Sequence, residues 1–163
     1  MGFAKGFERF SKTVDKICLL LVVIMLAAMV GITCAQIVCR LWFKALNWSE
    51  EATRYLLVWS TFLGASCVYR ANGHIAITAL HGLIPPKIKK AMQIAIHVLC
   101  IVVFVMAVYY GIIYAGRQSA QLSASMRIPM SYMYAAIPVG FALCLLHAVN
   151  HIVQLCVGEE GAA

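Results

Sequence analysis

The chain has 163 residues, of which 63% are hydrophobic and only 12% are charged. A soluble globular chain has roughly 45–50% apolar residues, and a water-soluble domain of this size could not bury the excess. Four uncharged runs make up more than half of the chain, at residues 17–39, 55–69, 91–116 and 131–157. The composition therefore excludes a disordered chain, a secreted protein and a cytoplasmic enzyme, and it indicates a small polytopic membrane protein.

The first run follows a basic tract and could be mistaken for a signal peptide. A signal peptide has an apolar region of about 7–15 residues and an A-x-A-like cleavage site. The run 17–39 is longer and has no such site. We therefore interpret it as an anchored first helix.

The other runs predict three further transmembrane helices. The run 55–69 is short, but Arg54 and Arg70 can extend their charges from its ends to the interface. The remaining two exceed the roughly 20 residues that a helix needs to span a bilayer. We predict an all-α integral membrane protein, one membrane domain over residues 1–163, with helices at about 17–39, 49–71, 87–116 and 131–157.

The stretch 71–86 between the second and third helices has isolated apolar residues among polar ones. This pattern predicts a short interfacial segment that lies on the membrane surface. Pro85 and Pro86 follow it, and proline is tolerated in the first turn of a helix. We expect the third helix to begin there.

Four helices place both termini on one side, and the basic residues predict which side. Cytoplasmic loops carry an excess of Lys and Arg. With the N-terminus inside, eight basic residues lie inside and five outside. The net charge of +7 is thus a signal of N-in/C-in topology; because no basic stripe with interleaved aromatics occurs, we predict no nucleic-acid partner.

The six acidic residues all lie outside the uncharged runs. Ion-coupled carriers usually place an ionisable group at membrane depth. A chain without such a carboxylate is not expected to transport by itself.

The cysteines and histidines offer little sign of a metal or redox site. The seven cysteines are odd in number and form no C-x-x-C, so they read as small apolar residues. His97 and His151 are predicted at equal depth on facing helices, as a bis-histidine haem would require, and His147 lies one turn from His151. The simpler interpretation is that all three bind neighbouring groups near the interface.

Small residues recur every four positions in each predicted helix. Such stripes let helix backbones approach closely in lipid. The stripes are Ala27, Gly31 and Ala35; Ser60 and Gly64; Ala107, Gly111 and Ala115; and Ala136, Gly140, Cys144 and Ala148. Together they favour a bundle with close partners.

The segment 47–65, NWSEEATRYLLVWSTFLGA, is followed by Arg70 and by His74-Ile. This pattern strongly resembles the small membrane subunit (DctQ type) of TRAP, or tripartite ATP-independent periplasmic, transporters. The Q-x-x-x-R of Gln36 and Arg40 and the stretch 128–140 also resemble that family. The resemblance covers nearly the whole chain.

The resemblance implies a non-catalytic scaffold in the bacterial cytoplasmic (inner) membrane, with no cofactor of its own. Its expected partners are membrane lipid, a large elevator-type membrane subunit that carries the sodium and substrate sites, and a periplasmic binding protein. The imported substrate would be an organic anion, such as a C4-dicarboxylate, a sialic acid or a sulfonate.

The same resemblance supplies candidate site residues. Candidates for contact with the large subunit are Gln36, Arg40, Trp48, Glu50, Glu51, Arg54, Arg70 and His74. Candidates for docking of the binding protein are Arg117 and Arg127.

Two other classes stay open on the residues alone. One is a haem- or quinone-binding anchor of a respiratory complex, served by the three histidines named above. The other is a self-sufficient small transporter, against which the positions of the acidic residues argue.

Overall fold

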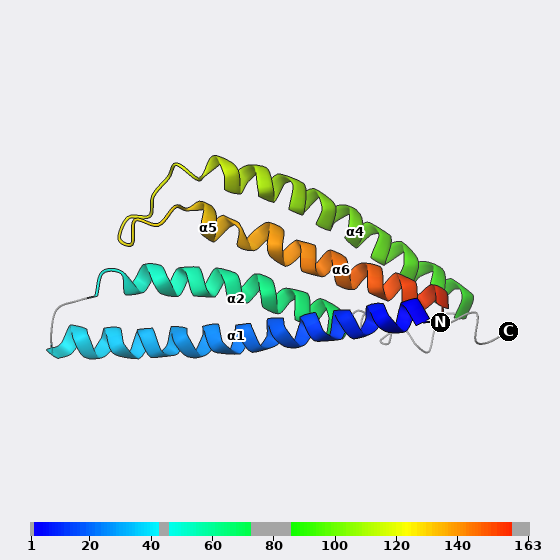
Figure 1. Ribbon diagram of the computed structural model, residues 1–163, viewed down its shortest axis with the longest axis horizontal. Helices are drawn as coiled ribbons and strands as arrows, with labels where there is room; N and C mark the ends of the chain where they lie inside the picture. The colour runs from blue at the N-terminus through cyan, green and yellow to red at the C-terminus, as the bar shows by residue number, and fades with distance from the viewer. Residues whose placement is uncertain (1, 43–45, 73–85, 158–163) are drawn as a thin grey trace.

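The computed structural model describes residues 2–42, 46–72 and 86–157 (Figure 1). These residues form four long helices and one single-turn helix. The elements are α1 (Gly2–Trp42), α2 (Ser49–Asn72), α4 (Pro86–Arg117), α5 (Ser131–Tyr134) and α6 (Ala136–Val157). Extended pairing within them is limited to a bridge between Leu122 and Pro129. The all-α prediction is confirmed for this part of the chain. Of the predicted interfacial segment 71–86, residues 71–72 end α2 and residue 86 begins α4, and the rest lies outside the described residues.

Helix α1 is longer than the predicted range 17–39, because the helix continues through the charged tract before it. Glu8 and Lys12, one turn apart, form an ion pair on its surface. Ser11 is buried against α6. At 1.5 Å per residue, the 41 residues of α1 extend about 60 Å, twice the roughly 30 Å of a bilayer's hydrocarbon core. Helix α1 must therefore tilt strongly or protrude from the membrane.

The predicted fourth helix, 131–157, is interrupted at Ala135. Pro138 lies three residues further on. It has no N–H to donate to the carbonyl of residue 134, and its ring crowds that carbonyl. The chain therefore forms the short helix α5, turns, and continues as α6.

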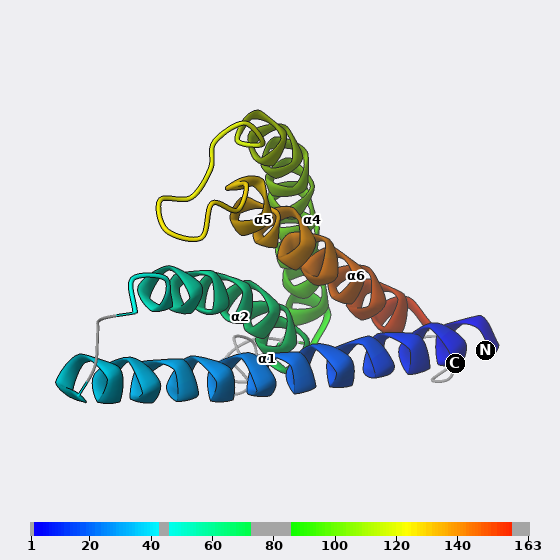
Figure 2. The ribbon, with the colours of Figure 1, turned by 60° about the vertical axis from the view of Figure 1, so that its left-hand side comes forward.

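Helix α6 is the centre of the bundle. It contacts α1, α2 and α4, whereas α1 packs chiefly on α2 and α4 chiefly on α6. Figures 1 and 2 show α1 beside α2, α6 beside α4, and the start of α1 at the same end as the end of α6. The two helix pairs lie close together at this end and diverge toward the other.

The predicted stripe on α6 is the seam of the bundle. Ala136, Cys144 and Ala148 are buried, and so is Gly140. A Cβ atom added at Gly140 would lie 2.7 Å from Cβ of Phe62 and 3.1 Å from its carbonyl oxygen. Only glycine therefore lets α6 approach α2 this closely.

The stripe on α1 is in a different situation. Ala27, Gly31 and Ala35 are all exposed. A Cβ atom added at Gly31 would meet nothing within 4 Å. This face of α1 is therefore open in the isolated chain.

Three helices of the described residues are long and apolar enough to cross a membrane. They are Gly6–Trp42, Met92–Arg117 and Ser131–Gln154. Helix α2, with 24 residues, is as long as these spans require, but it is more polar, with Glu50, Glu51, Arg54 and Arg70 near its ends.

We predict opposite outcomes for two glycine-to-alanine substitutions. Gly140→Ala should destabilise the chain by about 1–3 kcal/mol, because the new methyl group overlaps Phe62. Gly31→Ala should leave stability unchanged or raise it slightly, because alanine favours the helix and fills open space. Thermal unfolding in detergent measures both, and equal melting temperatures would contradict the close α2–α6 contact.

Candidate functional site

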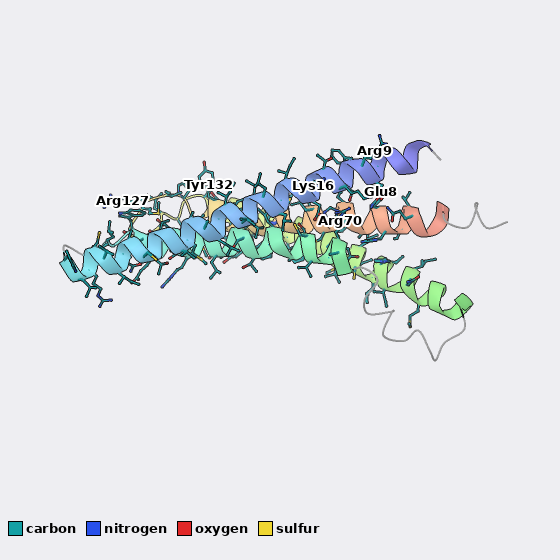
Figure 3. The ribbon with its side chains drawn as sticks, turned by 90° about the horizontal axis from the view of Figure 1, so that it is seen from below. Glu8, Arg9, Lys16, Arg70, Arg127 and Tyr132 are labelled. Carbon is teal, nitrogen blue, oxygen red and sulfur yellow. The ribbon has the colours of Figure 1, made fainter. Side chains whose placement is uncertain are left out.

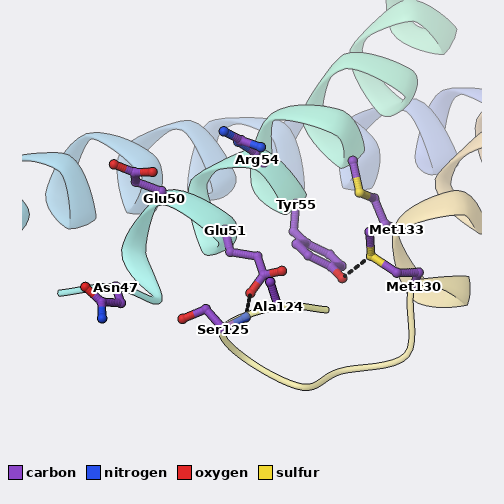
Figure 4. A pocket seen from close by; sticks show the side chains of 9 residues that line it. All are labelled: Asn47, Glu50, Glu51, Arg54, Tyr55, Ala124, Ser125, Met130 and Met133. Carbon is purple, nitrogen blue, oxygen red and sulfur yellow. Dashed lines mark hydrogen bonds between the residues drawn. The ribbon is translucent and has the colours of Figure 1, made fainter. Parts of the chain in front are cut away.

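The end of α1 and the start of α2 form a polar corner, which we call the α1–α2 corner. A hollow of about 420 Å³ is lined by Gln36 and Arg40 of α1 and by Leu46, Asn47 and Glu50. A second hollow of about 270 Å³ begins at the same Asn47 and Glu50. Its other lining residues are Glu51, Arg54, Tyr55, Ala124, Ser125, Met130 and Met133 (Figure 4). The structure thus brings together five of the predicted partner-contact residues.

The start of α2 is fixed by Ser49. Its side chain is buried, and its hydroxyl donates a hydrogen bond to the carbonyl of Leu46 at 2.6 Å. The backbone N–H of Ser49 donates to the same carbonyl at 3.2 Å. This tight turn holds the residues on both sides of it at the corner.

Glu51 ties α2 to the long loop 118–130. Its Oε2 accepts hydrogen bonds from the backbone N–H groups of Ser125, at 3.0 Å, and Met126, at 2.8 Å. The two N–H groups converge on one carboxylate oxygen, so a single side chain of α2 holds this part of the loop.

Two aromatic residues of α2 continue this attachment. The hydroxyl of Tyr55 donates to Sδ of Met130 at 3.3 Å, and Nε1 of Trp59 donates to the carbonyl of Tyr132 at 3.1 Å. Glu51, Tyr55 and Trp59 recur every four residues and so lie along one face of α2. This face holds the loop and the start of α5 in place.

The loop has its own ordered turn. The N–H of Ser123 donates to the carbonyl of Ile128, and the N–H of Met130 donates to that of Gln121. Between them, Arg127 has a φ of 52°, in the left-handed region that costs most residues roughly 1 kcal/mol. The turn therefore presents Arg127 in a fixed but strained backbone conformation.

Arg40 and Arg54 have no ion-pair partner in the described part of the chain, where the ion pairs are Lys12–Glu8 and Arg70–Asp15. Glu50 and Arg54, although one turn apart, do not pair. In Figure 4 both lie on the side of α2 away from the loop.

Arg70 lies at the opposite end of the bundle, where it pairs with Asp15 of α1. Figure 3 shows Arg70, Lys16, Arg9 and Glu8 toward this end, and Arg127 at the other. Both groups of the Arg70–Asp15 pair are only 20% exposed. Arg70 therefore already forms an ion pair within the chain, and this pair competes with its predicted contact with a partner.

A cluster of polar residues lies at the same end of the bundle as this ion pair. Oγ of Ser11 and Nδ1 of His147 form a buried hydrogen bond of 2.8 Å, and the hydroxyl of Tyr69 lies 3.0 Å from Nδ1 of His97. The cluster comprises Ser11, Asp15, Tyr69, Arg70, His97, His147, Asn150 and His151. These residues come from all four long helices and join the ends that lie close together.

The geometry of the histidines gives the haem alternative no support. The rings of His97 and His151 are stacked, with centres 5.4 Å apart and planes 9° from parallel. Axial haem ligands instead point a ring nitrogen at the iron from opposite sides. The described residues contain no group of three or more His, Cys, Asp or Glu side chains placed to hold a metal ion. The absence of a cofactor from this subunit stays a prediction.

The remaining predicted residues lie apart from the corner hollows. Trp48 is beside the corner but lines neither hollow. Arg117 ends α4 and lines a separate groove with Tyr110, Tyr114 and Ile137. His74 lies outside the described residues.

Sequence reasoning missed the partners that lie far along the chain. Asp15 is 55 residues from Arg70, and Ser125 is 74 residues from Glu51. No local spacing reveals such pairs. Asn47 lines both hollows and belongs to the motif segment 47–65, but it is not among the residues predicted to contact a partner.

These features define the class of protein. Long apolar helices enclose polar contacts at the ends of the bundle, so the chain is a multi-pass helical membrane protein.

Residues 29–158 match the sequence model of the family described as "Tripartite ATP-independent periplasmic transporters, DctQ component". The chain belongs to this family, and the resemblance found in the sequence is confirmed. Membership assigns it to transport.

Several TRAP transporter permease proteins are similar to the chain. It is 34% identical over 113 residues to the sialic acid TRAP transporter permease protein SiaT of Haemophilus influenzae, an alignment that covers 69% of this chain but 18% of SiaT. It is 32% identical over 74 residues to a putative TRAP transporter small permease protein of the same species, covering 45% of this chain and 46% of that protein. It is 23% identical to the small permease protein SiaQ of Vibrio cholerae, covering 93% of this chain and 90% of SiaQ. The chain thus spans less than half of the first two relatives and nearly all of SiaQ.

We predict that Glu51→Ala frees the loop 118–130. The N–H groups of Ser125 and Met126 lose their acceptor, so hydrogen–deuterium exchange in the loop peptide should accelerate by roughly tenfold. Glu50→Ala is the matched control, because Glu50 makes no such bond, and it should leave exchange unchanged. Equal exchange in both variants would refute the role of Glu51.

Proposed function

We propose that this chain is the non-catalytic scaffold subunit of a sodium-coupled TRAP transporter. It supports a large elevator-type membrane subunit that binds sodium and substrate. A periplasmic binding protein delivers the substrate, an organic anion of the carboxylate, sialic acid or sulfonate class. The family match over residues 29–158 carries this proposal.

The relation to SiaT supports the pairing with a larger subunit. The alignment covers 18% of that permease protein, so more than four-fifths of SiaT lies outside the part similar to this chain. A segment of this kind therefore occurs as a minor part of one longer permease chain. In the present protein the same relation would join two chains.

The distribution of carboxylates supports a scaffold rather than a carrier. The uncharged runs contain no acidic residue. Asp15, which lies two residues before the first run, is paired with Arg70. The chain thus offers no free carboxylate at membrane depth for ion coupling.

The proposed topology has four spans, with both termini in the cytoplasm and the α1–α2 corner facing the periplasm. The basic residues at the N-terminus and in the first turns of α4 support this orientation. Helix α2 would be the fourth span, since its 24 residues extend about 36 Å. The membrane would be the bacterial inner membrane.

The sequence of this subunit does not identify the substrate. Relatives are named for different substrates: sialic acid for SiaT and SiaQ, and ectoine for TeaB of Halomonas elongata, which is 25% identical over 102 residues.

Reconstitution tests the proposal. Proteoliposomes with this chain, the large subunit and the loaded binding protein should accumulate substrate under an inward sodium gradient. Liposomes with this chain alone should not. Uptake by this chain alone would show that it is a carrier, and a Soret band in the purified protein would revive the haem anchor.

The open stripe of α1 is one proposed contact with the large subunit. Gly31→Ile should lower co-purification of the large subunit by about tenfold, because small residues permit close helix approach. The isolated chain should be no less stable, since a Cβ atom at Gly31 meets no described atom within 4 Å. Full recovery of the large subunit with this variant would exclude the stripe from the interface.

The loop 118–130 is the proposed surface for the binding protein. Arg117→Glu and Arg127→Glu should each slow uptake several-fold at low salt, through weaker charge steering, without loss of the large subunit. Arg127→Asn removes the charge with a residue that tolerates the left-handed backbone, so it separates charge from loop conformation. Unchanged uptake with both reversals would place docking elsewhere.

A further inference from the structure

The α1–α2 corner has more positive than negative charge available to a partner. It contains the guanidinium groups of Arg40 and Arg54 and the carboxylates of Glu50 and Glu51. The carboxylate of Glu51 is already engaged by the N–H groups of Ser125 and Met126. Two arginines therefore face one free carboxylate.

The two arginines line neighbouring hollows that share two residues. Asn47 and Glu50 line both hollows, with Arg40 in one and Arg54 in the other. Neither arginine forms an ion pair within the described residues, and Glu50 and Arg54 do not meet. Guanidinium groups are matched in shape and charge to carboxylates, which they bind through two parallel hydrogen bonds.

The surroundings point to a partner within the membrane. Leu41 and Trp42, which follow Arg40, are 74% and 80% exposed. The open stripe of α1 leads along the same helix toward the corner. Apolar and small residues beside unpaired arginines suit a helical partner that brings its own acid side chain, since buried interface charges need to be paired.

We propose that the α1–α2 corner is a receptor for an acidic side chain, Asp or Glu, of the large membrane subunit. This inference rests on the proposed function and adds the chemistry of the contact. Arg40 and Arg54 hold the incoming carboxylate, and the loop bound to Glu51 keeps the second hollow open to it. Glu50 limits the corner to a single added negative charge.

The first experiment measures assembly of the complete complex. Arg40→Gln and Arg54→Gln should each lower the amount of large subunit that co-purifies with this chain, and the double variant should lower it by about tenfold. Arg117→Gln is the matched control, an exposed arginine at the same end of the bundle that does not line the corner. Unchanged thermal unfolding of the isolated variants would show that folding is intact.

The second experiment identifies the occupant. A photo-crosslinking amino acid at Asn47, which lines both hollows, should form an adduct with a large-subunit peptide that contains Asp or Glu. Replacing that acid with lysine, in combination with Arg54→Glu, should restore assembly. A purely structural role of Arg54 would not produce this rescue.

The outcomes separate this inference from the proposed function. If the wild-type chain recovers no large subunit, the proposed function itself fails. If the double variant recovers the large subunit normally, the pairing stands and the corner inference is overturned. Adducts only with lipid or with the binding protein, or none, would also overturn it.

Discussion

The close approach of α6 to α2 is the constraint on which the rest of the structure depends. In lipid, apolar side chains gain nothing by leaving their solvent, so helices associate through close packing and polar contacts. Gly140 provides the closest approach, against Phe62, and the buried Ala136, Cys144 and Ala148 extend it along α6. Because α6 touches the other three long helices, this seam sets where each of them stands.

Polar contacts also hold the helices together, and they differ between the two ends of the bundle. At one end, a cluster from all four helices is directed inward, with side chains such as His147 fully buried. At the other, Glu51 fixes a loop, while Arg40 and Arg54 form no ion pair with any described residue. At one end Asp15 and Arg70 pair with each other, whereas at the other the two arginines are available to a partner.

The positions of the helices could be predicted because hydropathy is local. The runs 17–39, 91–116 and 131–157 each fall within one long helix or its interrupted continuation. The N-terminal extension of α1 could not be predicted in this way. The uncharged run begins only after Lys16, whereas the helix already begins at Gly2. The stripes of α1 and α6 were equally regular in sequence, and only the fold shows that one is buried and the other open.

The sequence predicted some residues of the candidate site but not their partners that lie far along the chain. Five of the eight motif residues line the hollows at the α1–α2 corner, and their contact with a partner stays a prediction. The contribution of the loop at Ser125, and the pairing of Asp15 with Arg70, depend on how the helices stack. Such contacts are set by the packing of segments that lie far apart along the chain.

The central place of α6 has a consequence for biogenesis. Helix α6 follows α1, α2 and α4 along the chain, so α4 is synthesised before the helix on which it chiefly packs. Helices α1 and α2 can pair as soon as both are inserted. Helix α4 lacks its main packing partner, and Gly111 lacks its neighbour Pro138, until α6 has been inserted. Ribosome-bound chains that stop short of α6 should therefore be open to membrane quality control.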